Sequence, residues 1–149
     1  MNDYIEYKYD VASEAEIAAH LTKCDADFTP RLSERVKIFD YSKKIKNNAT
    51  RFEAWSNCKL VGMIAAYCND DQRQVAYVTS VSVLRLWTGK GIADHLLGLC
   101  IDHIKVLGIA RISLEVAQTN AAAIKLYEKN GFTKGKTTGS VVAMNFKLN

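Results

Sequence analysis

The stretch from Val75 to Leu107 constrains the fold of this chain most, because a strand and a helix meet there across a glycine loop. Residues 75–83 follow a turn and have the composition of a strand. After the loop at 88–93, Thr-Gly-Lys-Gly-Ile-Ala, apolar residues recur with the period of a helix that Gly108 closes. These helical positions are Ile92, Leu96, Leu97, Cys100, Ile101, Ile104 and Leu107. The stretch therefore predicts a sheet covered by helices.

The rest of the chain supplies further strands and helices. Apolar and polar residues alternate over 5–11, which predicts a strand, and Ser13 and Glu16 have the spacing of a capping box at the start of a helix. We expect an antiparallel meander of strands at 50–56, 60–68 and 75–83, a strand at 112–116, a helix at 121–129, a further strand near Phe132 and a terminal strand at 141–148. The expected order is βααβββαβαββ.

A second helix is expected between the first helix and the meander. Pro30 follows Thr29 and is well placed as the first helical residue after a threonine cap. Leu32, Val36 and Phe39 continue on helical spacing. The pattern predicts one continuous helix that ends near 47–48.

Composition indicates an ordinary globular protein. Of the 149 residues, 48% are hydrophobic and 24% charged, without internal repeats, so we expect one α/β (α+β) domain over 1–149. The 20 basic residues exceed the 16 acidic ones by four and are spread along the chain, which disfavours a nucleic-acid partner. The cysteines lack a CxxC pair and are interpreted as buried free thiols. Without a signal segment or a membrane span, a cytoplasmic protein with no membrane partner is expected.

The glycine loop is typical of an anion site. Backbone amides at a helix N-terminus bind phosphate oxygens, and glycine lets a ligand approach the backbone closely. A pyrophosphate is the expected guest, and a tight connection without a ligand is the alternative. The dinucleotide pattern GxGxxG would place its third glycine at Asp94, and a P-loop requires Gly-Lys-Ser/Thr, so neither applies.

A second motif lies downstream, in the segment NAAAIKLYEKNGF at 120–132. Its characteristic residues are Asn120, Ala123, Tyr127, Gly131 and Phe132. With Gly91 and Ala93 of the loop, this motif resembles the GNAT superfamily of acetyl-CoA-dependent N-acetyltransferases, whose main motif is Arg/Gln-x-x-Gly-x-Gly/Ala. The resemblance covers 78–132, and the upstream order of elements also agrees with it. It implies a central mixed, mostly antiparallel sheet flanked by about four helices.

The resemblance implies a set of residues that bind acetyl-CoA. The strand segment Val81, Ser82 and Val83 would pair with the pantetheine arm, and the loop Thr88, Gly89, Lys90, Gly91, Ile92 and Ala93 would hold the pyrophosphate through its amides. Asn120 and Ala123 would contact the cofactor arm. The family's opening Arg or Gln is replaced by Thr88, and the adjacent Lys90 would restore part of the lost charge.

Acetyl transfer requires a neutral amine, stabilisation of an oxyanion and a proton for the departing thiolate. Tyr127, whose phenol has a reference pKa of ~10, is the predicted proton donor, and a packed helix tyrosine is the alternative reading. A backbone amide near Val81 would polarise the thioester carbonyl if a bulge turns it toward the cofactor.

The proton acceptor is less defined. Many relatives carry a glutamate on the fourth strand where this chain has Thr79, a substrate-side residue. Either a water chain leads to Tyr77, Glu53 or Glu115, or the acceptor amine is already substantially neutral. A lysine-type amine, with reference pKa ~10.4, would need a base. The second reading favours a small-molecule amine such as an amino sugar.

The segment 28–45, with Phe28 as a substrate-side residue, would cover the acceptor pocket or would simply pack on the sheet. His20, His95 and His103 share no metal-ligand spacing with cysteines or carboxylates, so no metal is expected. A homodimer is compatible with the sequence. Two other functions remain open: an acetyl-CoA-binding regulatory module without catalysis, and a protein N-acetyltransferase.

Overall fold

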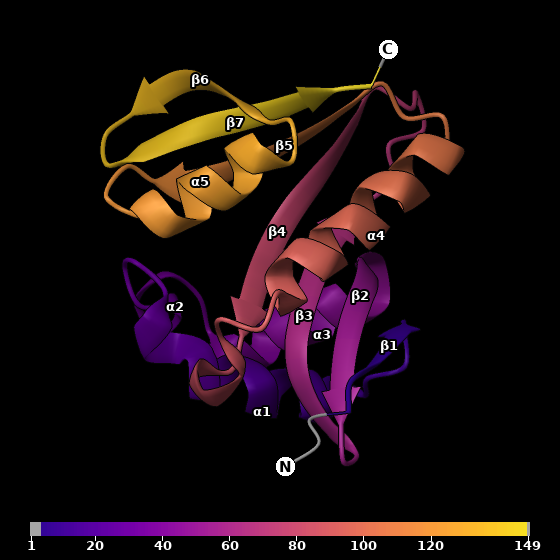
Figure 1. Ribbon diagram of the computed structural model, residues 1–149, viewed down its shortest axis with the longest axis vertical. Helices are drawn as coiled ribbons and strands as arrows, with labels where there is room; N and C mark the ends of the chain where they lie inside the picture. The colour runs from indigo at the N-terminus through magenta and orange to yellow at the C-terminus, as the bar shows by residue number, and fades with distance from the viewer. Residues whose placement is uncertain (1–3, 149) are drawn as a thin grey trace.

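The computed structural model describes residues 4–148 and forms, within them, a seven-stranded sheet between two groups of helices (Figure 1). The elements are β1 Glu6–Tyr9, α1 Glu14–Cys24, α2 Leu32–Arg35, α3 Ile38–Asn48, β2 Thr50–Ser56, β3 Lys59–Tyr67, β4 Val75–Val83, α4 Ile92–Val106, β5 Arg111–Ala117, α5 Ala121–Lys129, β6 Thr133–Thr138 and β7 Val141–Lys147, with short 3₁₀ turns η1 Asp25–Asp27 and η2 Arg85–Trp87. The strand order is β1-β2-β3-β4-β5-β7-β6, and every pair except β4–β5 is antiparallel. The predicted mixed, mostly antiparallel sheet is confirmed.

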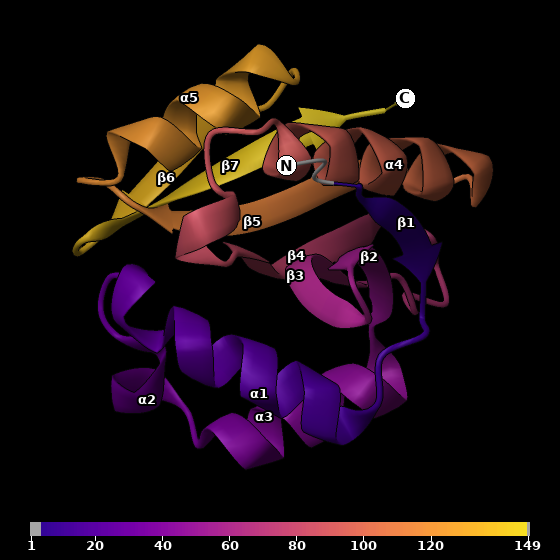
Figure 2. The same ribbon diagram turned by 60° about the horizontal axis from the view of Figure 1, so that its bottom comes forward.

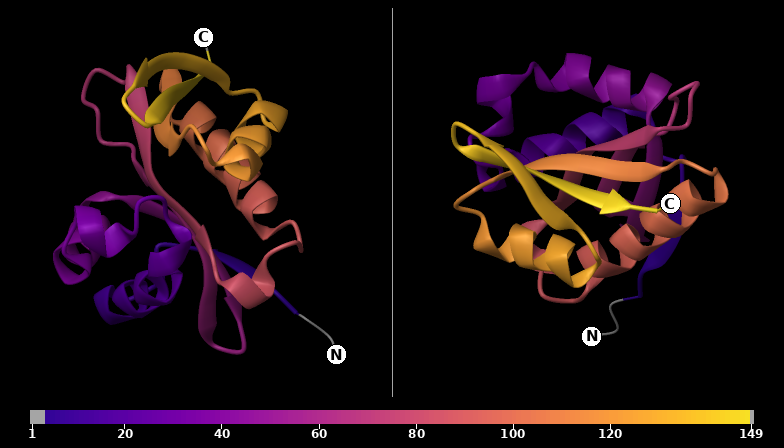
Figure 3. Two further views of the ribbon diagram at one scale, coloured as in Figure 1. Left: turned by 90° about the vertical axis from the view of Figure 1, so that its left-hand side faces the viewer. Right: turned by 90° about the horizontal axis from the view of Figure 1, so that it is seen from above.

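The helices cover opposite faces of the sheet. Helices α1, α2 and α3 lie on one face, and α4 and α5 lie on the other (Figures 2 and 3). Each face has its own apolar cluster: Ile17 and Ile45 pack with Met63 on the first, and Leu97 and Ile104 belong to the second. No helix within residues 4–148 is long and apolar enough to cross a membrane.

The segment after α1 differs from the prediction. The Thr29–Pro30 bond is cis, α2 begins only at Leu32, and the chain is extended at Val36 before α3 begins, so five helices replace the expected four. Val36 and Ile38 both pack on the first apolar cluster although they are two residues apart, a spacing that suits an extended chain. Phe39, which the helical reading placed on the buried face, is 74% exposed.

Other predictions from local sequence are confirmed in part. The capping box of Ser13 and Glu16 is present, with both hydrogen bonds formed. The first strand is shorter than predicted because Asp10 has φ +54° and turns the chain, its carboxylate accepting from the Arg51 amide. The cysteines are free, but only Cys24 and Cys100 are buried. Cys58 lies exposed in the two-residue turn between β2 and β3.

The feature that positions the site is a gap between β4 and β5. These parallel strands pair only from Val75 to Tyr77 on β4, although β4 continues to Val83 and β5 continues to Ala117. Beyond Tyr77 the two strands diverge. Ala65 on β3 pairs with Ser80 while Ala66 pairs with Val78, so Thr79 is an extra residue in β4. The bulge expected near Val81 is therefore present two residues earlier, at the start of the divergence.

Candidate active site

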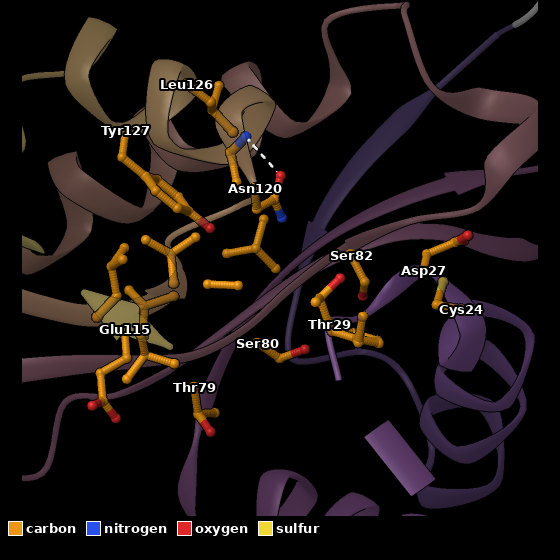
Figure 4. Close-up of a pocket in the computed structure, with 18 of the residues that line it drawn as sticks. Cys24, Asp27, Thr29, Thr79, Ser80, Ser82, Glu115, Asn120, Leu126 and Tyr127 are labelled. Atoms are coloured by element: carbon orange, nitrogen blue, oxygen red, sulfur yellow. Dashed lines mark hydrogen bonds between the residues drawn. The ribbon is translucent and has the colours of Figure 1, made fainter. Parts of the chain in front are cut away.

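A cavity of about 310 Å³ fills the gap between β4 and β5 and is lined from both faces of the sheet (Figure 4). The lining residues include Cys24 at the end of α1, Asp27, Phe28, Thr29, Pro30 and Arg35 from the segment after it, Tyr77 to Val83 from β4, Leu114 to Ala117 from β5, and Asn120, Ala123, Leu126 and Tyr127 from α5 and its N-cap. A ligand bound on the α5 side can therefore meet one bound on the α2 side through the sheet.

The predicted cofactor segment of β4 lies at this gap. Val81, Ser82 and Val83 all line the cavity. The amide of Leu84 donates to Val61 on β3, at 2.8 Å. Because backbone groups alternate sides along a strand, those of Val81 and Val83 point the other way, toward the gap that β5 has left. That edge of β4 fits an extended ligand arm.

The glycine loop lies beyond the end of β4, at the start of α4. Gly89 and Gly91 have φ of +77° and +79°, and a Cβ built on either would meet nothing within 4 Å. The space outside the loop is thus open. The backbone amides of Gly91, Ile92 and Ala93 lie at the N-terminus of α4, where no carbonyl of the helix accepts a hydrogen bond from them. The Ile92 side chain is buried in the core, so only its backbone can face a ligand. This cradle fits a pyrophosphate.

Thr88 does not replace the long side chain that the family motif carries. Its hydroxyl donates to the Arg85 carbonyl at 2.7 Å and closes the η2 turn. None of the six loop residues lines the cavity, so the structure separates the loop from the place where the chemistry would occur.

Helix α5 supplies the other predicted residues. Asn120 caps the helix through its side-chain oxygen, which accepts from the Ala123 amide at 3.1 Å, and both residues line the cavity. Figure 4 shows the Tyr127 hydroxyl directed into the cavity. Burial raises the pKa of Tyr127 to about 12, and the phenol has no hydrogen bond to any of residues 4–148. It can therefore donate a proton to a ligand.

The α2 side of the cavity holds a carboxylate. The Tyr77 hydroxyl donates to Glu115 Oε1 at 3.2 Å across the gap between the strands. Burial, and then the Glu115 charge, raises the pKa of Tyr77 to about 12. Both residues were among the predicted proton acceptors, and both line the cavity.

Glu53, the third predicted acceptor, has a structural role instead. Its buried carboxylate accepts from the Arg51 guanidinium, the Trp55 indole and the Ala12 amide, at 3.0–3.1 Å. Glu53 lies on β2, outside the cavity, and its oxygens are satisfied. Sequence alone does not separate it from Glu115, because both are carboxylates on strands.

A histidine lies behind the wall of the cavity. His20 Nδ1 is 3.1 Å from the Leu60 carbonyl and must carry the proton, so Nε2 accepts from the Ser82 hydroxyl at 2.9 Å. Burial lowers the pKa of His20 to about 4. The neutral imidazole thus orients Ser82, a partnership that no sequence signal indicated.

Thr79 and Phe28, the predicted substrate-side residues, line the same cavity. Several other lining residues were not predicted, among them Cys24, Asp27, Arg35 and Ser80. Cys24 ends α1, and Ser80 follows the bulge in β4. Asp27 and Arg35 belong to the segment between α1 and α3.

Residues 14–132 match the family model described as the acetyltransferase (GNAT) family. The chain belongs to this family. Among solved structures, a GNAT-type fold is found in the PaiA N-acetyltransferase of Thermoplasma acidophilum in complex with coenzyme A, which has a TM-score of 0.76 and 20% identity over 97% of this chain and 99% of that one. The Escherichia coli ribosomal-protein-S18-alanine N-acetyltransferase has a TM-score of 0.77 and 20% identity over 98% of this chain and 95% of that one.

Curated relatives of this GNAT chain are similar over part of their length. The mycothiol acetyltransferase of Corynebacterium efficiens is 35% identical over 79 residues, which are 53% of this chain and 26% of the relative. The N-alpha-acetyltransferase 30 of Schizosaccharomyces pombe is 30% identical over 89 residues, which are 57% of this chain and 58% of the relative. The match thus spans between about a quarter and three fifths of the length of these relatives.

Proposed function

We propose that this chain is an acetyl-CoA-dependent N-acetyltransferase that acts on a primary amine of a small molecule. One observation carries the proposal: the cavity between β4 and β5 has the Tyr127 phenol on its α5 side and the Glu115 carboxylate on its α2 side. A proton donor for a leaving thiolate and a proton acceptor for an amine are two of the groups that acyl transfer requires.

Acetyl-CoA would supply the reactive thioester. The amides of Gly91, Ile92 and Ala93 would hold its pyrophosphate, and the exposed edge of β4 at Val81 and Val83 would hold its pantetheine arm. Tyr127 is proposed to donate its proton to the departing sulfur. Its raised pKa keeps the phenol protonated at neutral pH, as a donor must be.

Glu115 is proposed to take the proton that the amine releases, and the Tyr77 hydroxyl to hold the carboxylate in place. The missing glutamate at Thr79 therefore does not leave the site without a carboxylate. An amine with a reference pKa of ~10.4 can then be deprotonated in the site, and the acceptor need not be a weakly basic amino sugar.

A second candidate acceptor is the α-amine of a protein chain. The likeness to an N-alpha-acetyltransferase supports it, whereas the likeness to mycothiol acetyltransferase supports a small molecule. The α-amine has a reference pKa of ~8, so either acceptor suits a carboxylate base.

Two measurements test the proposal. Acetyl-CoA should raise the thermal midpoint, because a ligand of the native state stabilises it, and no shift would refute cofactor binding. Release of free CoA thiol should then be followed with sugar amines, polyamines, amino acids and peptides. Binding without release by any amine would favour a regulatory module, and release with peptides alone would favour a protein N-acetyltransferase.

A further inference from the structure

Three charged side chains line the cavity within the described chain, and two of them are engaged. Asp27 forms an ion pair with Arg85, with 2.5 Å between Oδ1 and Nη2. Glu115 accepts the hydrogen bond from Tyr77. Arg35 has no ion pair with any acidic side chain of residues 4–148. Its charge is therefore available to a ligand.

Arg35 is an exposed residue at the α2 side of the cavity. It is the last residue of α2, and its guanidinium lies 6.0 Å from the centre of the Phe28 ring, another lining residue. Burial raises the pKa of Tyr77 and of Tyr41, and the Arg35 charge opposes both shifts. The Arg35 charge thus reaches Tyr77, which lines the cavity, and Tyr41, which binds the Thr79 carbonyl.

Ser80 lies on the same wall but does not offer its hydroxyl to the cavity. Ser80 is 5% exposed, and its Oγ, which has no hydrogen-bond partner among the described residues, is closed off from the cavity and lies toward the Tyr41 phenol. Figure 4 labels Ser80 and Thr79 on β4 and Glu115 among the residues that line the cavity. The cationic group on this wall that a ligand can reach is therefore Arg35.

We propose that Arg35 binds an anionic group of the acceptor, a carboxylate or a phosphate, while Glu115 receives its amine. The planar guanidinium forms paired hydrogen bonds with both kinds of anion. The preferred acceptors are then small amines that also carry a negative charge. This inference rests on the proposed acetyltransferase function, because it concerns a substrate of the same cavity.

The test uses two pairs of amines that differ in the anionic group: β-alanine against β-alaninamide for the carboxylate, and phosphoethanolamine against ethanolamine for the phosphate. KM and kcat are measured by thiol release for the wild type and for Arg35→Gln and Arg35→Lys. Arg31→Gln is the matched control, since Arg31 is also exposed in this segment but does not line the cavity.

Arg35→Gln should raise the KM of the charged member of at least one pair about tenfold or more, with the uncharged member and acetyl-CoA unaffected. Arg35→Lys should recover part of this loss, and Arg31→Gln should match the wild type. The pair that responds identifies the anion as a carboxylate or a phosphate.

Equal KM changes for charged and uncharged amines in Arg35→Gln would overturn the inference. Turnover of other amines would in that case leave the proposed function standing. If none of the four amines is acetylated, and none shifts the thermal midpoint of the CoA-saturated protein, the inference also fails. Absence of any shift with acetyl-CoA itself would instead refute the proposed function.

Discussion

The Tyr41 phenol on α3 donates a hydrogen bond of 2.7 Å to the backbone carbonyl of Thr79, the extra residue in β4. This bond holds the bulge from the side opposite α5, two residues before Val81. A peptide unit is planar, so a fixed carbonyl restrains the backbone that follows it. Tyr41 therefore helps to aim the β4 amides at the gap between β4 and β5.

Tyr41→Phe should lower kcat about fivefold or more, as expected for the loss of one hydrogen bond of ~1 kcal/mol at the bulge. The KM of acetyl-CoA should change less than kcat, since the pyrophosphate loop at 88–93 makes no contact with the bulge that Tyr41 holds. Tyr9→Phe is the control, because the Tyr9 hydroxyl on β1 has no hydrogen bond to any of residues 4–148 and Tyr9 does not line the cavity. Equal effects of the two substitutions on kcat would contradict the prediction.

Tyr127→Phe tests the proton donor. Loss of a general acid should lower turnover about 10²-fold to 10⁴-fold. Acetyl-CoA should still raise the thermal midpoint, because the phenol makes no hydrogen bond that holds residues 4–148 together. Steady-state kinetics and a thermal shift assay on the same preparation separate the two effects. An unchanged kcat would remove Tyr127 from the acid role.

Glu115→Gln tests the base through the pH profile. Gln keeps an oxygen that can accept from Tyr77 but cannot take a proton. Turnover should fall about 10²-fold near pH 7, and the deficit should shrink as the pH approaches the amine's own pKa, where the acceptor is already neutral. A deficit that is constant from pH 7 to pH 10 would argue against this role.

Gly91→Ala tests the cradle. A side chain at φ +79° costs ~1 kcal/mol or more, and the added Cβ would occupy the open space outside the loop. The KM of acetyl-CoA should rise while the acceptor KM stays constant. Gly98→Ala is the control, since Gly98 lies inside α4 with nothing near its Cβ, and this change should stabilise the protein by ~1 kcal/mol.

His20 predicts a dependence of stability on pH. Its pKa is about 4 in the folded protein against an ordinary histidine value of 6.5, so the unfolded chain binds more protons between these pH values. Stability should therefore fall as the pH drops from about 6.5 to 4, by on the order of 3 kcal/mol from this residue. Urea unfolding at pH 7 and pH 4.5 checks this, and His20→Gln should lose less stability over that range than the wild type.

Local sequence signals predicted the elements well where a short segment decides its own structure. The capping box at Ser13, the helical period after Gly91 and the asparagine that begins α5 act within one or two turns of chain. The helix predicted to begin at Pro30 was misplaced. Proline favours the first turn of a helix, but the packing of Val36 and Ile38 on the first apolar cluster outweighs this preference.

By itself, the sequence determined the order of strands and helices, the glycine cradle and the identity of the α5 motif, since each depends on the spacing of neighbouring residues. Only the tertiary structure decided that β4 and β5 separate after Tyr77 and that Thr79 bulges. These features bring Arg35, Glu115 and Tyr127 to one cavity, although they are far apart in the chain. Strand register arises from the packing of the whole sheet, and no local pattern encodes it.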